Sequence, residues 1–424
     1  MATTSSVTSH PVFFTTQTPY PLPSQKYMLP ATWKRYQLSQ LINKALSLPK
    51  PVPFDFLVRG QVLRTSIGDW CAENGVVEEE TLELEYIQSV MPPERMSDIP
   101  HDDWVSSVSC QIPGTFYTAS YDGHVRAFDY SQKMKWIYHA HSAPITSLCV
   151  VSRTENDGPS LIATSSHDLT AQILRITDNE KIEPLASLHL HTSTVSSVCS
   201  NAAGSHLLTA SWDALLALWD TSIPASDEVP EDGERIKRRR KDPGAPKRKA
   251  PLTVLKSHSA RISRAVFDPQ HAVRAYSCGF DSTVRQWDVE NGLCTHTITA
   301  SEKPFLDMAL SADGNTALAA STDRTVCVYD VRDAKANAIR ASIASLSHSD
   351  TPSCVATGAE VHQVLTGAYD GVVRLWDLRS VKSAMTSFRV WDGKQKILTL
   401  DWQRGMVAVG GEGGFEVWRA DGER

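Results

Sequence analysis

Short runs of alternating apolar and polar residues recur along most of the chain. Runs such as RAVF and VVRLW, with turn residues between them, are typical of half-buried β-strands. A helical spacing appears only near the start, where Leu38, Leu41, Ile42 and Ala45 lie three or four positions apart. The pattern therefore predicts a mainly β protein with a helix in its first part.

One ten-residue motif recurs in the second part of the chain. It reads small residue, any residue, Asp, two residues, small apolar residue, two residues, aromatic residue and usually Asp. Clear copies span Ser120–Asp129, Ser211–Asp220, Gly279–Asp288, Ser321–Asp330 and Ala368–Asp377, and degraded copies span Ser166–Arg175 and Gly410–Arg419.

The spacing of these copies indicates a propeller. Successive turn acids are 42 to 47 residues apart, except for one gap of 68 residues. A four-stranded propeller blade repeats about every 40–45 residues. The motif resembles that of WD-repeat proteins over roughly Asp102 to Arg419, which predicts a seven-bladed β-propeller with one insertion between blades.

The closure of this ring stays open at the level of sequence. Only six residues follow Trp418, too few for another full strand. Because a propeller must close on itself, the outer strand of the last blade either comes from the segment Ile87–His101 or is missing.

The first hundred residues have a different order of elements. HPVFFTT reads as a strand, Leu38–Leu46 as a helix, Phe54–Cys71 as two strands around a turn at Arg59-Gly60, and TLELEYI as a last strand. This order predicts a ubiquitin-like β-grasp domain over residues 1–88, a linker over 89–101 and the propeller over 102–424.

Charge is distributed unevenly along the chain. The formal net charge is −6, but the segment Glu234–Lys249 alone carries +7 and the remainder −13. An acidic body argues against nucleic-acid binding by the whole surface. The basic segment lies in a predicted disordered insertion at 222–251.

The basic residues of this insertion form two clusters, KRRRK and KRK. They are Lys237, Arg238, Arg239, Arg240, Lys241, Lys247, Arg248 and Lys249. Two clusters separated by Pro and Gly predict a two-part nuclear import signal, and ribosomal RNA phosphates are the second use. A solvated loop without a partner is the alternative.

The cysteines and the apolar runs restrict the class of protein. Eight cysteines are scattered without a C-x-x-C pair, which favours reduced, buried thiols in an intracellular protein over zinc or disulfide use. The N-terminal segment lacks the pattern of a secretory signal, and no apolar run approaches the roughly 18 residues of a membrane span. We expect a soluble, non-secreted protein.

Four histidines each precede the first strand of a repeat. His141, His191, His258 and His348 lie 22 to 27 residues before the turn acids Asp168, Asp213, Asp281 and Asp370. A His–Asp pair suggests catalysis or a metal, but an active site occurs once and this pairing recurs. The resemblance to WD-repeat proteins implies a structural network of His, Ser or Thr, Asp and Trp.

The residue before each turn Asp is expected to point out onto one face of the propeller. Four of these seven residues are aromatic, namely Tyr121, Trp212, Phe280 and Tyr369, and the others are His167, Thr322 and Gly411. A ring of exposed aromatic residues suits protein recognition. The alternative is that these side chains only pack against neighbouring loops.

Three consecutive glutamates stand in NGVVEEETLELEY, Asn74 to Tyr86, directly before a predicted strand. The residues alone leave catalytic, metal-binding, partner-binding and merely solvating roles open. An enzyme would use Glu78, Glu79 or Glu80 as acid and base, yet no nucleophile elbow, phosphate loop or metal spacing accompanies them.

The combination of both parts resembles a known family. Lys50–Ile67, the strand LELEY and Asp103–Val108 resemble a Notchless-like N-terminal domain joined to a seven-bladed propeller, as in the Ytm and WD-repeat protein twelve family of ribosome biogenesis factors. Notchless itself is similar only in the first domain.

The resemblance implies a non-enzymatic assembly factor without a cofactor. It would act in the nucleolus and nucleoplasm on the large (60S) ribosomal subunit and in ribosomal RNA processing. Its partners would be Pescadillo and the Block-of-proliferation propeller protein, which complete a trimer, and the AAA ATPase midasin, which removes it. The alternative function is an adaptor that recruits substrates to a ubiquitin ligase or chaperone.

The resemblance also implies a role for one glutamate. Glu79 would offer its carboxylate to the Mg²⁺ of midasin's adhesion site, since hard divalent cations take oxygen ligands. Glu78 or Glu80 takes this role if the register differs by one, and a solvated acidic turn is the alternative. The segment Gln88–Asp102 would then carry tension between the two domains.

Overall fold

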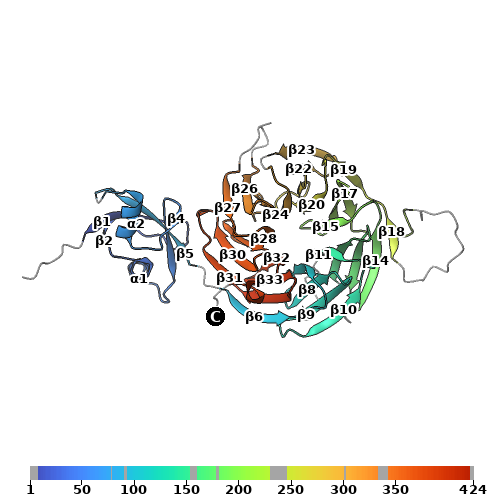
Figure 1. The fold of residues 1–424 in the computed structure, drawn as a ribbon, viewed down its shortest axis with the longest axis horizontal. Coiled ribbons are helices and arrows are strands. Elements are labelled where there is room, and N and C mark those ends of the chain that lie inside the picture. Colours follow the sequence, from blue (N-terminus) through green and yellow to red (C-terminus); the bar gives the residue numbers. More distant parts are fainter. Residues whose placement is uncertain are drawn as a thin grey trace, which may run out of the picture. The chain divides into compact units, whose positions relative to one another are not determined.

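The computed structural model describes residues 8–77, 79–89, 93–152, 160–177, 181–229, 246–299, 302–332 and 342–420. It divides into two compact units with a boundary near residue 91, and the segment Trp376–Thr386 is grouped with the first unit. Figure 1 shows both units, with the chain coloured from its N-terminus to its C-terminus.

The first unit is a five-stranded mixed sheet with two helices. Its elements are β1 (Ser9–Thr15), β2 (Lys26–Pro30), α1 (Arg35–Ala45), β3 (Phe54–Val58), β4 (Gln61–Val62), α2 (Ile67–Asn74) and β5 (Leu82–Gln88). The strand order is β2-β1-β5-β3-β4. β5 is parallel to β1 and antiparallel to β3, which is the arrangement of the predicted β-grasp.

The core of this unit follows the sequence periodicity. Leu38 and Ile42, one helical turn apart, are fully buried on one face of α1. They join Leu84 and Tyr86, the inward residues of the alternating strand β5. Neither helix described here is long or apolar enough to cross a membrane.

One sequence prediction in this unit is wrong. The second predicted strand after the Arg59-Gly60 turn is only Gln61–Val62, and Ile67–Asn74 is helical. Ser66 caps α2 by accepting a hydrogen bond from the Asp69 amide at 3.1 Å, and Gly75 ends it at φ 66°. Ser66 and Gly75 are the sequence features that indicate this helix, whereas the apolar pattern favours a strand. Strand β2 was also missed.

The described residues of the second unit form seven sheets arranged in a ring, as the seven repeats predict (Figure 1). The first sheet holds β7 (Val105–Ser109), β8 (Thr115–Ser120), β9 (His124–Asp129) and β10 (Met134–His139), and the second holds β11 (Ile145–Ser152), β12 (Ser160–Ser166), β13 (Ala171–Ile176), β14 (Ile182–Leu188) and β18 (Lys247–Lys249). The third holds β15 (Val195–Ser200), β16 (His206–Ser211), β17 (Leu215–Asp220) and β19 (Thr253–Lys256), and the fourth holds β20 (Ile262–Phe267), β21 (Arg274–Gly279), β22 (Val284–Asp288) and β23 (Leu293–Ile298).

The remaining three sheets complete the ring. The fifth holds β24 (Phe305–Leu310), β25 (Thr316–Ser321), β26 (Thr325–Asp330) and β27 (Ala344–Ser347), and the sixth holds β28 (Pro352–Thr357), β29 (Gln363–Ala368), β30 (Val372–Asp377) and β31 (Thr386–Arg389). The seventh holds β32 (Ile397–Gln403), β33 (Met406–Gly411), β34 (Gly414–Arg419) and β6 (Glu94–Ile99), and a short 3₁₀ turn, η1 (Trp391–Gly393), precedes it. The innermost strands β7, β11, β15, β20, β24, β28 and β32 are neighbours around the centre.

Strand β6 answers the question of ring closure. It is the outermost strand of the seventh sheet and runs antiparallel to β34, with Ser97 opposite Val417. The segment predicted as a linker at 89–101 therefore contains a propeller strand. This sheet combines three strands from the end of the chain with one that precedes the first blade.

The insertion after β17 differs from its prediction as a disordered loop at 222–251. Lys247–Lys249 form β18, which pairs in parallel with β14 of the second sheet. Lys237–Lys241 lie outside the described residues. The second basic cluster is thus an ordered strand, because its backbone completes the edge of the preceding blade.

Candidate functional site

The repeated histidines lie in networks inside the blades. The Nδ1 atoms of His141, His191 and His258 lie 2.8, 3.0 and 2.8 Å from the carboxylates of their turn acids. On the other side of the imidazole, His258 Nε2 lies 2.7 Å from Ser277 Oγ, and Trp287 Nε1 donates to the same oxygen at 2.8 Å. This confirms the predicted structural network for these three histidines. In the sixth blade the predicted pairing of His348 with Asp370 is replaced, since His348 Nδ1 faces the Leu346 carbonyl at 3.0 Å while its Nε2 meets Thr366 Oγ1 at 2.7 Å.

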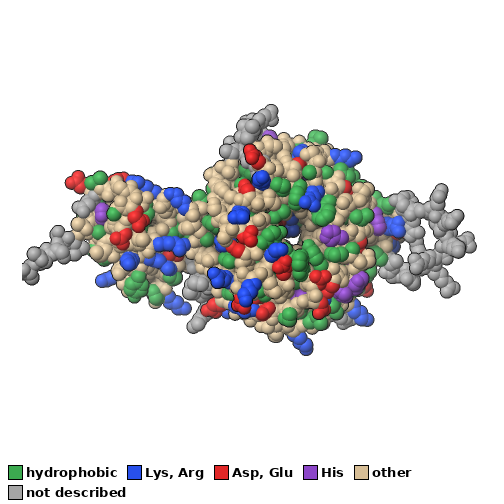
Figure 2. Space-filling model, viewed as in Figure 1, with side chains coloured by type: hydrophobic (Ala, Val, Ile, Leu, Met, Phe, Trp, Pro, Cys, Tyr) green, Lys and Arg blue, Asp and Glu red, His purple; other side chains and the backbone are tan. Residues whose placement is uncertain are grey.

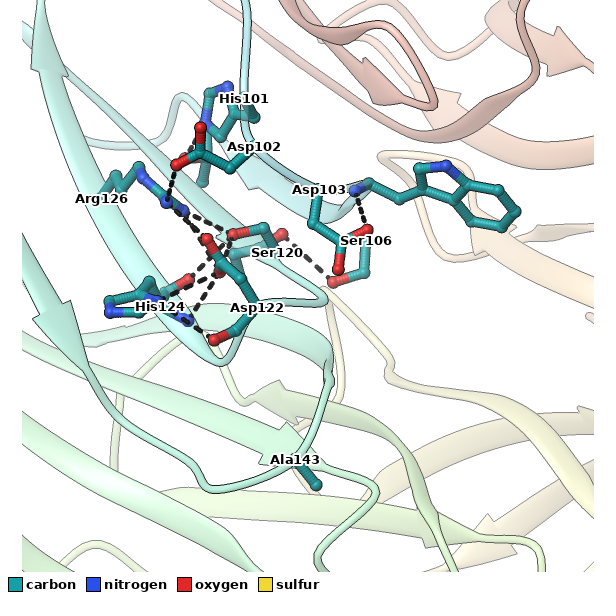
Figure 3. Close-up of polar contacts among 12 residues, drawn as sticks. His101, Asp102, Asp103, Ser106, Ser120, Asp122, His124, Arg126 and Ala143 are labelled. Carbon is teal, nitrogen blue, oxygen red and sulfur yellow. Dashed lines mark hydrogen bonds and ion pairs between the residues drawn. The ribbon is translucent and has the colours of Figure 1, made fainter.

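In two blades an arginine takes the place of the histidine as the main side-chain partner of the turn acid, and Arg285 Nη2 also lies 3.4 Å from Asp281 in the fourth blade. Asp122 in the first blade is paired with Arg126 and also accepts the hydroxyl of Ser120 (Figure 3). Asp370 in the sixth blade is 2.6 Å from Arg374 Nη2. Burial alone would raise the pKa of the Asp122 carboxyl, but the bonds from Arg126, Ser120 and the His124 amide bring this pKa well below its usual range.

The first blade also has a histidine that the sequence reading missed. His101 Nε2 lies 3.0 Å from Thr118 Oγ1, the contact that the other blade histidines make with Ser or Thr. Its Nδ1 faces the Ile99 carbonyl at 3.1 Å rather than an aspartate. Its position 21 residues before Asp122 was the available signal.

The residues before the turn acids form an arc of side chains over adjacent blades. The ring of Tyr121 lies 5.9 Å from Trp104 and 6.4 Å from His167, and His167 lies 5.5 Å from Trp212. Trp104 and Trp212 each remain 42% exposed. Of the four aromatic residues predicted on this face, only Trp212 is exposed, while Tyr121, Phe280 and Tyr369 are half-buried. Tyr121 and Trp212 pack on neighbouring side chains, and a role in protein recognition stays a prediction.

Arg261 extends this arc to the fourth blade. Its guanidinium carbon lies 3.6 Å from the centre of the Phe280 ring and 5.2 Å from that of Trp212. Tyr369 lies elsewhere on the ring, 5.5 Å from the Lys396 ammonium. Both cations are favourably placed over aromatic faces, and Arg261 is a residue that sequence reasoning did not identify.

Charge and apolar surface are interspersed on the propeller. On the face visible in Figure 2, apolar side chains lie near the central opening and side chains of both charges lie around them.

The described residues contain no group of three or more His, Cys, Asp or Glu side chains that could hold a metal ion. Burial raises the pKa of the thiols of Cys149, Cys278 and Cys354, which keeps them protonated and unreactive.

The described part of the basic strip is only partly accessible. The side chain of Lys249 is 3% exposed, and its ammonium contacts Asp220 and the Ser222 carbonyl. The Arg248 amide donates to Asp227 at 3.0 Å, and the Ala250 amide donates to Glu228 at 3.0 Å. The acids before the strip therefore hold its second cluster in place, which the sequence reading did not foresee.

The acidic turn lies between α2 and the central strand β5. Val77 is 67% exposed, and Glu79 and Glu80 are also exposed. The turn is held at one end by the Gly75 cap and at the other by a hydrogen bond from the Glu80 amide to the Val77 carbonyl at 3.0 Å. Glu78 lies outside the described residues.

The two described glutamates of this turn differ in their partners. Arg59, from the β3–β4 turn, donates from Nη2 to Glu80 Oε1 at 2.6 Å. Within the described residues, Glu79 makes no hydrogen bond or ion pair. Of these two glutamates, Glu79 is therefore the one whose exposed carboxylate has no counter-charge among the described residues.

Known families match both units. Residues 11–71 match the NLE (NUC135) domain, and residues 182–220, 249–288, 292–330 and 340–377 match the WD domain, G-beta repeat. The chain is 58% identical, over its whole length and 97% of the relative, to the ribosome biogenesis protein YTM1 of Laccaria bicolor. It is 56% identical to the protein of that name from Coprinopsis cinerea, over 98% of this chain and 96% of the relative, and 30% identical to that of Kluyveromyces lactis, over 90% and 89%.

Proposed function

Because the chain belongs to the family of YTM1 ribosome biogenesis proteins, we propose that it is a non-catalytic assembly factor of the large ribosomal subunit that links a trimer to a remodelling ATPase. The trimer partners are Pescadillo and the Block-of-proliferation propeller protein, and the ATPase is midasin. It acts in ribosomal RNA processing in the nucleolus and nucleoplasm, on the pre-60S particle.

The single observation that carries this proposal is the state of Glu79. Its carboxylate is exposed and has no cation beside it in the described part of the chain, while the neighbouring Glu80 is paired with Arg59. A carboxylate that completes the shell of a partner's Mg²⁺ has to be accessible and free of a local cation. Within the described residues Glu79 meets both requirements, so we assign to it the contact with the metal site of midasin.

The aromatic arc supports a protein partner on the propeller. Trp212 and Arg261 are residue types that dominate binding energy in protein interfaces, and Trp212 keeps 42% of its surface open. Stacking on Phe280 fixes the Arg261 side chain before binding, which lowers the entropy cost of association. Tyr121, Trp212, Phe280 and Tyr369 are therefore assigned to the contact with the Block-of-proliferation protein.

The basic strip is assigned to nuclear import, with ribosomal RNA as its second ligand. Lys237–Lys241 would carry this role, because Lys249 is buried against Asp220 and is not free for a receptor. Contact with phosphates would weaken steeply as salt is added, whereas import depends on receptor binding. The two uses can therefore be separated by an RNA-retention assay at increasing salt.

The proposal is tested by the variant Glu79→Ala. We expect it to leave the fold and the trimer intact, so that co-purification from nuclear extract still recovers Pescadillo and the Block-of-proliferation protein. Release from the pre-60S particle by midasin should stop. Glu80→Ala in the same turn is the matched control and should release normally.

Two results would contradict the proposal. Normal release of the Glu79→Ala variant would rule out the proposed contact between Glu79 and the metal site of midasin. Recovery of ubiquitin ligase subunits in place of ribosomal precursors by mass spectrometry would favour the adaptor function instead.

A further inference from the structure

Strand β6 is held differently from the other strands of its sheet. Only Ser97 of its six residues is buried, whereas five of the six residues of β34 are buried. Among the other outer strands, β10, β23 and β31 have no buried residue, whereas β19 and β27 each place a fully buried leucine in the core, Leu255 and Leu346. Since β6 contributes little apolar burial, its attachment depends on the backbone ladder with β34 and on polar side chains.

The main polar contact of β6 is a latch between Arg95 and Glu416. Arg95 Nη2 lies 2.7 Å from Glu416 Oε1 on β34 and 2.6 Å from Asp98 Oδ2. The Glu416 side chain is fully buried, and its second oxygen accepts Trp418 Nε1 at 2.9 Å. A buried carboxylate that loses its cation is strongly unfavourable, so Arg95 is the residue on which this attachment depends.

Polar contacts also join β6 to the first blade. Gln132 of that blade donates to the Met96 carbonyl in the first half of β6 at 3.0 Å, and His101 bridges the Ile99 carbonyl and Thr118 of β8. Its N-terminal end, Glu94, is exposed and is the end that the chain reaches from β5, which stops at Gln88. A pull on the first unit therefore enters the propeller one residue before Arg95, so the latch is among the first contacts to bear the load.

We infer that β6 is a releasable closure strand, and that Arg95 is the latch that sets the force needed to open it. This inference rests on the proposed function insofar as an ATPase pulls on the first unit. Tension applied at Glu94 would break the ladder with β34 pair by pair, starting at the Glu94–Arg419 end. The edge of β34 would then be unpaired, and the seventh and first blades would be joined only by their direct contacts, such as that of Phe415 with Phe128.

The inference can be tested on the full chain with optical tweezers. One handle is attached at Ser89 and the other at the C-terminus, so that the load passes directly from β6 to β34. We expect a first rupture at low force that releases only β6, followed by unfolding of the rest of the propeller. Arg95→Ala should lower the force of the first rupture. Arg332→Ala, which removes the exposed ion pair with Asp330, should leave it unchanged.

A cross-link provides the second variant. Ser97→Cys with Val417→Cys joins two residues that face each other in the ladder. Oxidation should abolish the first rupture and reduction should restore it. Rupture of the oxidised protein at the same low force, or unfolding of the wild type in one event, would overturn the inference.

A measurement on the unmodified protein covers variants that fail to fold. Amide hydrogen exchange of the full chain should show β6 opening before the outer strands β19 and β27, and equal protection of the three would contradict the inference. None of these experiments contains midasin, so their failure would not affect the role of Glu79. Conversely, loss of the Glu79 contact would leave the opening of β6 unchanged.

Discussion

Carboxylates occur in both units, but their surroundings differ. The turn acids Asp168, Asp213 and Asp281 recur at the same place in successive blades, and each is bonded to a histidine and to the backbone of its own turn. Glu79 occurs at one place in the first unit and, within the described residues, has no partner. Repeated and satisfied polar groups build the fold, whereas a single unsatisfied group is available to another molecule.

Lowering the pH tests the turn carboxylates together, because all of them become protonated. Burial would raise the pKa of Asp281, but bonds from His258, Thr283 and Ser259 lower this pKa below its ordinary value of 3.8, and the pKa of Asp122, Asp168, Asp213 and Asp370 is lowered too. Folded pKa values below the unfolded ones stabilise the protein above about pH 4, and this stability is lost as the pH falls through the folded values. Denaturant titrations between about pH 6 and about pH 2 should show this loss.

Removing one hydrogen-bonded turn carboxylate should lower the free energy of unfolding more than the other single substitutions below. Asp281→Ala leaves the buried His258 without its acid and should lower the free energy of unfolding by about 3 kcal/mol. Asp323 occupies the same turn position in the fifth blade, but it is exposed and bonds mainly to Thr325. Asp323→Ala is therefore the matched control and should cost less than about 1 kcal/mol. Equal losses would show that burial of the pair is unimportant.

Lys249→Ala should cause the second largest loss in the free energy of unfolding. Its buried ammonium is bonded to Asp220 and Ser222, so Lys249→Ala should destabilise the propeller by about 2 kcal/mol. Lys247, two residues earlier, donates to the Ala225 carbonyl at 2.8 Å, and Lys247→Ala should cost about 0.5 kcal/mol. Chemical denaturation of both variants measures the difference, and a smaller loss for Lys249 would mean that the second cluster is free for a ligand.

Arg59 should have a small effect on stability. Its ion pair with Glu80 joins side chains that are 56% and 48% exposed, and such surface pairs contribute about 0.5 kcal/mol. Thermal unfolding of Arg59→Ala checks this value. A loss above about 2 kcal/mol would mean that the pair supports the fold of the acidic turn.

Glu79 should have the smallest effect on stability. Glu79→Gln removes a charge that has no partner among the described residues, so the free energy of unfolding should change by less than about 0.5 kcal/mol. The same denaturant titration measures it beside the Asp281 variant. A clear destabilisation would indicate a structural partner and would end the contrast between the two units.

The sequence predicted the repeated part of the molecule best. The motif copies located all seven blades, because the same apolar and turn positions recur in each. The closing strand β6 could not be predicted from its own residues, since only Ser97 is buried and Glu94, Arg95 and Asp98 are exposed. Its strand conformation is imposed by the edge of β34, a partner more than 300 residues later in the chain.

Short-range signals also misled the prediction at two places. The helix α2 was read as a strand because Val62, Leu63 and Ile67 favour one, although Ser66 and Gly75 mark a helix start and end. Lys249 was placed in an exposed strip because lysine is rarely buried, and its burial depends on Asp220, which lies 29 residues earlier. Glu79 could be placed in a turn, but the pairing of Glu80 with Arg59 required the structure.

The role of Glu79 is tested most directly by the affinity of the full chain for the isolated adhesion domain of midasin, measured calorimetrically with Mg²⁺ and after chelation. We predict Mg²⁺-dependent binding that Glu79→Gln weakens by at least about 2 kcal/mol and that Glu80→Gln leaves nearly unchanged. Binding that survives chelation, or that depends on Glu80 and not on Glu79, would contradict the account.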